Sequence, residues 1–216
     1  MLVYERMSKH PITITEDTPI NEAMKLMRAE KVRRLPVLNK KGELVGIVSE
    51  KDLLYVSPSP ATSLSIYELH YLISKITVGE IMTTDVITVS ERTPLEEAVR
   101  IMADNKIGGL PVMRDGKLVG IITESDLFKI FLELLGAREM GVRLTMLVPE
   151  QMGTLADITC AVADMGGSII SLSTFLGEDP TNRLITIKVA GIPEDELVAE
   201  MKPRALKIVD ARTCDS

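Results

Sequence analysis

The chain has 216 residues, of which 45% are hydrophobic and 3% aromatic, and its formal net charge is −6. This length allows one large or two small domains with buried cores. The acidic balance and the few aromatic residues argue against a nucleic-acid partner, which needs positive charge and stacking platforms. Residues 1–6 lack a basic region followed by an apolar segment, and no stretch approaches the roughly 18 apolar residues of a membrane-spanning helix. We therefore expect a cytoplasmic protein without a membrane partner.

The first two thirds of the chain contain an internal repeat. Its two copies keep a constant separation of 75 residues until one residue is lost in a turn, after which the separation is 74. Such a register of matches indicates a duplicated structural unit. The matched residues include Met7 and Met82, Pro36 and Pro111, Gly46 and Gly120, and Asp52 and Asp126.

Each copy is predicted to fold as β-α-β-β-α. Alternating residues at 12–15, repeated at 86–89, predict a short strand. The Thr-Pro pair that comes next predicts a helix start, where Thr93 and Glu96 would form a capping box. Two further strands, expected in the first copy at residues 34–38 and 44–48 and joined by a turn at Gly42, predict a hairpin, and a helix comes after it. One copy leaves an apolar sheet face open, so we expect the two copies to stack.

These elements resemble CBS motifs, and their duplication resembles a CBS pair, or Bateman module. The resemblance rests on the Leu-Pro-Val strand and on a Gly-x-x-[Ser/Thr]-x-x-Asp strand-to-helix junction, each of which is present twice. It implies a CBS-pair module at residues 1–135, with motifs at about 3–56 and 78–135 and a linker with a helix at 57–77. The linker and the C-terminal part of the chain resemble bacterial acetoin-utilisation accessory proteins.

The strand-to-helix junctions carry the candidate ligand-binding groups. A carboxylate such as Asp52 or Asp126 can accept hydrogen bonds from both hydroxyls of a ribose. Ser49 and Thr123, three residues earlier, lie at helix starts, where free N–H groups favour an anion such as phosphate. The same pairs are also capping boxes with Asp in place of Glu, which would serve helix initiation alone. Both interpretations can hold together.

The resemblance to CBS motifs implies two clefts, each formed by the first strand of one motif and the aspartate of the other. One cleft would combine Met7, Ile12, Val32 and Arg33 with Thr123 and Asp126. The other would combine Met82, Ile87, Ile107 and Gly108 with Ser49 and Asp52. Pro36 and Pro111, in the Leu-Pro-Val strands of the two copies, complete the expected binding residues. The implied regulatory ligand is AMP, ADP, ATP or S-adenosylmethionine.

The two clefts differ in charge. Arg33-Arg34 precedes the Leu-Pro-Val strand of the first copy, whereas the second copy has Gly108-Gly109, so fixed positive charge suited to phosphate exists on one side only. Arg34 is the stronger phosphate candidate because some nucleotide-binding CBS motifs carry a basic residue there. The open alternative is a solvated arginine pair at a strand edge. The two glycines allow a close backbone approach or a bulge.

From Arg143 onward the pattern predicts a second domain with the order βαββαβ, a ferredoxin-like arrangement. The first helix would carry Leu155, Ile158, Thr159 and Val162 on one face and end at Gly166-Gly167. Strands are expected at residues 144–148, 168–176, 184–189 and 205–211, with a short helix after Pro193. Residues 136–216 resemble ACT domains, regulatory modules that often bind amino acids where two copies meet. A ligand at residues 151–155 and pure dimerisation are the two alternatives.

No catalytic or metal-binding set is visible. His10 and His70 have no partner at metal-ligand spacing, and Cys160 and Cys214 are too few for a zinc site or a disulfide framework. We therefore predict a non-enzymatic sensor of the α/β (α+β) class that binds an adenosyl small molecule and forms a homodimer or a higher homo-oligomer. Its expected partner is a metabolic enzyme, in acetoin or acetyl-CoA metabolism. The alternative is an oligomeric scaffold that works without a ligand.

Overall fold

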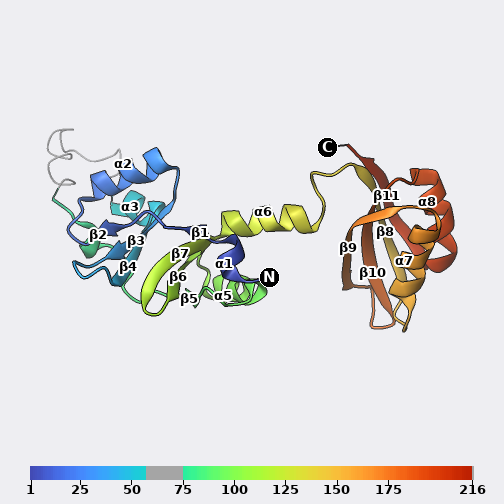
Figure 1. Cartoon of the computed structure of the whole chain (residues 1–216), viewed down its shortest axis with the longest axis horizontal. Helices are drawn as coiled ribbons and strands as arrows, with labels where there is room; N and C mark the ends of the chain where they lie inside the picture. The colour runs from blue at the N-terminus through green and yellow to red at the C-terminus, as the bar shows by residue number, and fades with distance from the viewer. Residues whose placement is uncertain (57–74, 216) are drawn as a thin grey trace. The chain divides into compact units, whose positions relative to one another are not determined.

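The computed structural model of the chain describes residues 1–56 and 75–215. It divides into two compact units, Met1–Leu127 and Phe128–Ser216, each built from helices and sheets (Figure 1). The mixed α/β class predicted from the sequence is therefore confirmed. The expected linker helix lies outside the described residues except for positions 75–77, and His70 lies outside them as well.

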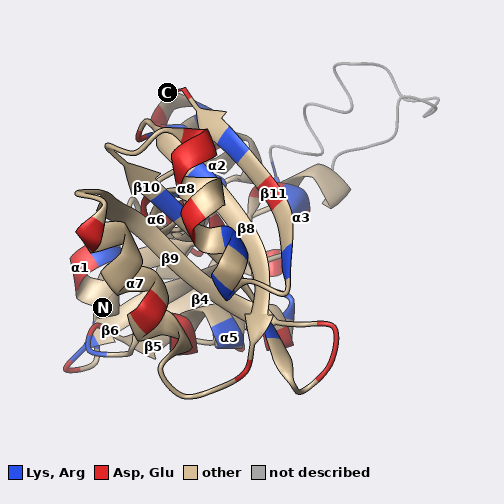
Figure 2. Cartoon of the chain, turned by 90° about the vertical axis from the view of Figure 1, so that its right-hand side faces the viewer, with Lys and Arg blue, Asp and Glu red and all other residues tan. Residues whose placement is uncertain are grey.

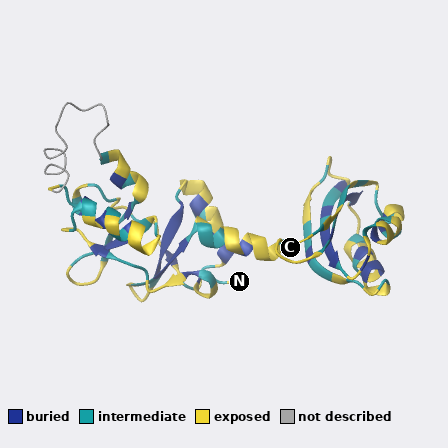
Figure 3. Ribbon diagram, turned by 90° about the horizontal axis from the view of Figure 1, so that it is seen from above, coloured by how far each residue is buried: buried dark blue, intermediate teal, exposed yellow. Residues whose placement is uncertain are grey.

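Both repeats in the first unit have the predicted order β-α-β-β-α. The first copy consists of β2 (Ile14–Thr15), α2 (Ile20–Glu30), β3 (Arg34–Leu38), β4 (Leu44–Ser49) and α3 (Glu50–Val56). The second copy consists of β5 (Val89–Ser90), α5 (Leu95–Asn105), β6 (Gly109–Arg114), β7 (Lys117–Thr123) and α6 (Glu124–Leu134). Helix α6 continues beyond Leu127, the last residue of the first unit. In each copy the first strand pairs in parallel with the second, and the second and third form an antiparallel hairpin. The buried residues lie mainly on these strands and on the inner helix faces (Figure 3).

The two copies exchange the segments that precede their first strands. Strand β1 (Ser8–Lys9) comes before the first copy but pairs antiparallel with β7 of the second copy. The matching residue of the second copy, Thr83, forms a bridge with Ile47 in β4 of the first copy. Each copy thus completes the sheet of the other, which is why the duplication produces a single compact unit.

The helix starts differ from the prediction by one residue. Helices α2 and α5 begin after Pro19 and Pro94, which occupy the N-cap positions without a side-chain cap hydrogen bond. The predicted capping box of Thr93 and Glu96 is therefore wrong. The threonine carbonyls instead accept hydrogen bonds from the segment that precedes the other copy. Val3 N–H donates to Thr93 O at 3.0 Å, and Thr18 O accepts the matching bond in the first copy.

The second unit is a four-stranded antiparallel sheet with two helices on one face. Its elements are β8 (Gly141–Pro149), α7 (Thr154–Asp164), β9 (Ser168–Leu176), β10 (Asn182–Ala190), α8 (Glu194–Met201) and β11 (Lys207–Cys214). The strand order β11-β8-β10-β9 is a split βαβ arrangement, in agreement with the predicted ferredoxin-like fold. The edge strand β11 carries both basic and acidic residues (Figure 2). Such charges on an edge strand disfavour pairing with another chain.

The core of the second unit lies between this sheet and the two helices. Leu144, Ile158, Ile187 and Leu197 are fully buried there. Leu155 is 42% exposed, so the expectation that it shares the buried face of α7 is wrong. It lies in the first turn of the helix, and the deeper turns of α7 supply the buried side chains.

The segment between α6 and β8 is anchored to the sheet. Lys188, which is only 4% exposed, donates from Nζ to the carbonyl of Gly136 at 2.9 Å. The Ser171 hydroxyl donates to the carbonyl of Leu135 at 3.2 Å. Gly136 adopts a left-handed backbone (φ +57°), and a side chain there would overlap Ile170. These contacts hold residues 135 and 136 against β9 and β10.

Candidate functional site

Each repeat places a hydroxyl residue and an aspartate at a strand-to-helix junction. In the first copy the N–H and hydroxyl of Ser49 donate to Asp52 Oδ2 at 2.8 and 2.7 Å, and Asp52 N–H donates to Ser49 Oγ at 3.3 Å. In the second copy the N–H and hydroxyl of Thr123 donate to Asp126 Oδ2 at 3.0 and 2.7 Å. The capping interaction is therefore present at the starts of both α3 and α6.

Capping leaves part of the Asp52 carboxylate for a ligand. Within the described ranges, the hydrogen bonds that Asp52 accepts all use Oδ2, and its side chain is only partly buried. An ionised carboxylate has two oxygens and about four acceptor positions. Helix capping and binding of a ribose diol are thus compatible at this residue.

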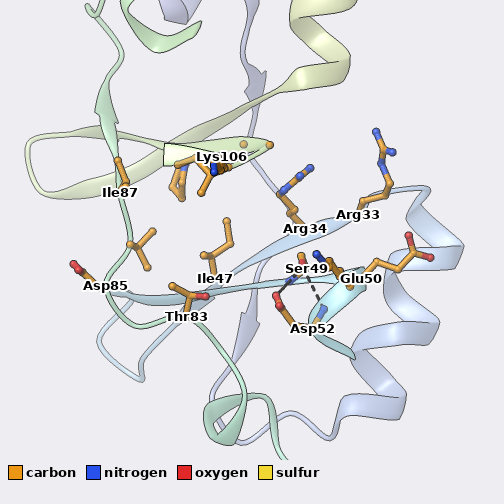
Figure 4. Close-up of a pocket in the computed structure, with 16 residues that line it drawn as sticks. Arg33, Arg34, Ile47, Ser49, Glu50, Asp52, Thr83, Asp85, Ile87 and Lys106 are labelled. Carbon is orange, nitrogen blue, oxygen red and sulfur yellow. Dashed lines mark hydrogen bonds between the residues drawn. The ribbon is translucent and has the colours of Figure 1, made fainter. Parts of the chain in front are cut away.

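A hollow of about 410 Å³ lies beside Ser49 and Asp52, between the two copies (Figure 4). Its volume is in the range of small-molecule sites, about 300–1,000 Å³. It brings together Ser49, Asp52, Ile87, Ile107 and Gly108, all expected in one cleft, with Pro111, Arg33 and Arg34, which were also expected to bind the ligand. Lining residues that the sequence analysis missed are Ile47, Glu50, Lys51, Thr83, Asp85, Val86, Lys106 and Gly109.

Some of the missed residues could have been found from their position in the sequence, next to residues that were expected in the cleft. Thr83, Asp85 and Val86 lie between Met82 and Ile87, both of which were expected in the cleft. Met82 itself is absent from the lining and packs against Gly46, where a Cβ would overlap its sulfur. The segment that reaches the hollow therefore begins after Met82.

The residues expected in the other cleft make separate contacts within the two copies. Met7 is buried and packs against Gly120, the counterpart of the contact between Met82 and Gly46. Ile12 and Val32 are partly buried and pack against the core of the first copy, and Pro36 is buried in β3. Thr123 and Asp126 form the junction described above. Of this group, Arg33 also lines the hollow beside Ser49.

The two arginines reach both junctions. Arg33 Nη2 donates to Ser125 Oγ at 2.8 Å, and Arg34 Nη2 lies 3.8 Å from Glu124 Oε2. Burial lowers the pKa of the Arg34 guanidinium, while the carboxylates of Glu124 and Asp52 oppose that shift. An arginine keeps its charge despite such a shift. The arginine pair is therefore a fixed positive charge at the wall of the hollow.

The glycines of the second copy make room for this charge. A Cβ at Gly108 would overlap the Arg34 guanidinium and the carboxylate of Glu124, and a Cβ at Gly109 would lie 3.1 Å from Arg34 Cδ. The register shift in this hairpin falls between Val112 and Met113 rather than at the glycines. The glycines thus allow the Arg34 side chain to approach the backbone closely, and the alternative of a bulge at this point is excluded.

A second hollow, of about 520 Å³, lies at the N-terminus of α7 in the other unit. Its lining includes Gln151, Thr154 and Leu155, where the sequence analysis placed a candidate ligand, and also Glu150 and Arg183. Glu150 and Arg183 form an ion pair with each other. The exposed Leu155 therefore lies at the wall of this hollow.

Two further observations concern metals and membranes. In residues 1–56 and 75–215, no three His, Cys, Asp or Glu side chains are grouped so that they could hold a metal ion. No helix in that same part of the chain is long and apolar enough to cross a membrane.

Several solved structures are similar to this chain. The Vibrio cholerae protein AcuB, named for acetoin utilization, is 35% identical, with a TM-score of 0.53 over 64% of this chain and 96% of that structure. The CBS domain pair of MJ0100, solved with 5′-methylthioadenosine and S-adenosyl-L-methionine, is 32% identical, with a TM-score of 0.51 over 61% of this chain and 95% of that one. CBSX2, solved with AMP, is 34% identical, with a TM-score of 0.50 over 61% of this chain and 96% of that structure.

The family match falls on the two repeats. The model of the CBS domain matches residues 3–59 and again residues 78–133, which together make up just over half of the chain. The segments agree with the duplicated β-α-β-β-α units of the first compact unit. The chain therefore belongs to the CBS domain family and carries a tandem CBS pair.

Proposed function

We propose that this protein is a non-enzymatic regulatory sensor that binds an adenine nucleotide or another adenosyl ligand in its CBS pair. The observation that carries the proposal is the hollow beside Asp52, which faces Ile87, Ile107 and Gly108 of the other copy and has two arginines in its wall. A carboxylate, an apolar wall and a fixed positive charge match the ribose, the base and the phosphate of a nucleotide.

Each part of the ligand has a candidate partner. The adenine ring would lie against Ile87 and Ile107, where apolar side chains and nearby backbone groups are available. The ribose hydroxyls would donate to the Asp52 carboxylate, and a phosphate would accept charge-assisted hydrogen bonds from Arg34. The ligands of MJ0100 and CBSX2 support this choice, because AMP, 5′-methylthioadenosine and S-adenosyl-L-methionine share the adenosyl group.

Binding would regulate by favouring one arrangement of the CBS pair over another. A ligand shifts such an equilibrium only through different affinities for the two states. We propose a domain division at about residue 135, with an ACT-like domain at 136–216 that dimerises or senses an amino acid near residues 151–155. The split βαβ topology and the hollow at α7 support this assignment. A cytoplasmic homo-oligomer that acts on an enzyme of acetoin or acetyl-CoA metabolism completes the proposal.

The alternative function is a ligand-independent scaffold. It is favoured by exposed apolar side chains on α6, where Phe128 is 68% and Phe131 57% exposed. Such side chains often belong to protein–protein contacts. A scaffold of this kind would bind its partner equally well after both Asp52 and Asp126 are replaced by Ala.

Thermal unfolding with and without AMP, ADP, ATP and S-adenosylmethionine separates the two functions. A ligand present at about 100 times its dissociation constant should add roughly 2.7 kcal/mol to the free energy of unfolding. We expect at least one adenosyl ligand to raise the melting temperature, and Asp52→Ala to remove the rise that depends on the hollow. Asp17→Ala is the matched control, because this exposed aspartate of the same copy lies outside the lining of the hollow. A cooperative transition that no ligand moves would favour the scaffold.

A further inference from the structure

The arginines of the first CBS copy lie between the two strand-to-helix junctions. Both residues line the hollow at the start of α3 (Figure 4). Both also contact the first turn of α6, because Arg33 donates to the Ser125 hydroxyl at 2.8 Å and Arg34 lies 3.8 Å from the Glu124 carboxylate. Each candidate cleft therefore has the same two guanidinium groups at its edge.

The second copy supplies no equivalent cations. Its matching residues are Gly108 and Gly109, and the space that their side chains would need is occupied by Arg34. The two copies are alike at the hydroxyl and the aspartate but unlike at this point. The arginine charge next to the junctions thus comes from one motif and lies near both of them, while Lys51 and Lys106 also line the hollow.

The present contacts of Arg34 leave it able to change partners. The Glu124 side chain is 53% exposed, and an ion pair at 3.8 Å with such a partner stabilises the protein little. A phosphate in the hollow would offer shorter charge-assisted hydrogen bonds to the same guanidinium. Such a phosphate would therefore draw Arg34 away from the start of α6.

From this arrangement we infer that the two clefts share one pair of arginines, so that the CBS pair binds only one phosphorylated adenosyl ligand tightly per chain. The inference rests on the proposed adenosyl-binding function and adds the coupling between the clefts. When the arginines contact a phosphate in the hollow, a second phosphate at the start of α6 meets Glu124 without them. An adenosyl ligand without a phosphate, such as adenosine, meets no such penalty.

Calorimetric titration of the full chain with AMP and with adenosine tests the coupling. For the natural sequence we expect one tight AMP site per chain and a second at least about 10-fold weaker, the effect of losing a charge-assisted bond. Adenosine should bind both clefts with similar affinity. Asp126→Ala and Asp52→Ala each leave one working cleft, and shared arginines predict that both variants prefer AMP over adenosine.

Two variants separate the role of Arg34 from a general loss of structure. Arg34→Met removes the charge, and Gly108→Ala keeps it but denies the guanidinium its place. Both should reduce the preference for AMP over adenosine about 10-fold or more, with adenosine binding retained. Arg28→Met is the matched control, because this exposed arginine of α2 lies outside the lining of the hollow.

The outcomes distinguish the coupling from the binding itself. Two equal AMP sites in the natural sequence would overturn the coupling and leave the adenosyl-binding function intact. A preference for AMP that survives in Asp126→Ala but disappears in Asp52→Ala would also overturn it, because the arginines would then serve the hollow alone. Absence of any binding by AMP and adenosine would overturn both.

Discussion

Leu110→Ala is expected to lower the free energy of unfolding of the first unit by about 2–5 kcal/mol. Leu110 is fully buried in β6, so its truncation removes apolar contacts and leaves a cavity that its neighbours fill only in part. Leu35→Ala, at the matching position in β3, should have a similar effect. Urea denaturation followed by circular dichroism measures both.

The control for this prediction is a leucine of the same unit that is exposed. Leu54 is 55% exposed on α3, so Leu54→Ala should change the free energy of unfolding by no more than about 0.5 kcal/mol. Because the copies complete each other's sheets, the variants at positions 35 and 110 should shift one common transition. An effect of Leu110→Ala as small as that of Leu54→Ala would contradict the position of Leu110 in the core.

Lys188→Met is expected to destabilise the second unit by about 1–3 kcal/mol. The methionine keeps most of the buried apolar stem but removes the ammonium group, so the buried carbonyl of Gly136 loses its donor. Release of residues 135 and 136 should also expose the neighbouring chain. We therefore expect faster cleavage by trypsin after Arg138, measured by mass spectrometry, together with a lower urea midpoint.

Lys207→Met provides the comparison on the same sheet. Lys207 is an exposed lysine of β11, so its replacement should leave both the midpoint and the cleavage after Arg138 nearly unchanged. Equal behaviour of the two lysine variants would show that the bond from Lys188 does not hold the segment.

The regular elements were predictable where the hydrophobic pattern decides the structure. The strands expected at residues 34–38 and 168–176 have the same limits in the structure. The first strands of the two copies are shorter than expected, because only residues 14–15 and 89–90 pair with a neighbour. Alternation shows that a segment is extended but not whether another strand is available along all of it.

The candidate site was predictable in part. The repeat indicated that Ser49 and Asp52 would meet residues near Ile87 and Gly108, and the structure places them around one hollow. The orientation of the Arg34 side chain was not predictable. It depends on the distance between the two copies, whereas the periodicity of the sequence describes only the elements within one copy. The helix starts were misassigned because the Thr18 and Thr93 carbonyls bind the other copy.

The exchange between the copies has a consequence for how such a protein arises. A single copy produced alone would have an unpaired edge on its hairpin and a leading segment with no sheet to join, and open edges of this kind recruit a second chain. Two identical single copies would satisfy each other by the same swap that occurs here within one chain. The tandem protein therefore has the structure of a fused symmetric dimer, and because its two halves are separate segments of one chain, the arginines of one side can stand opposite the glycines of the other.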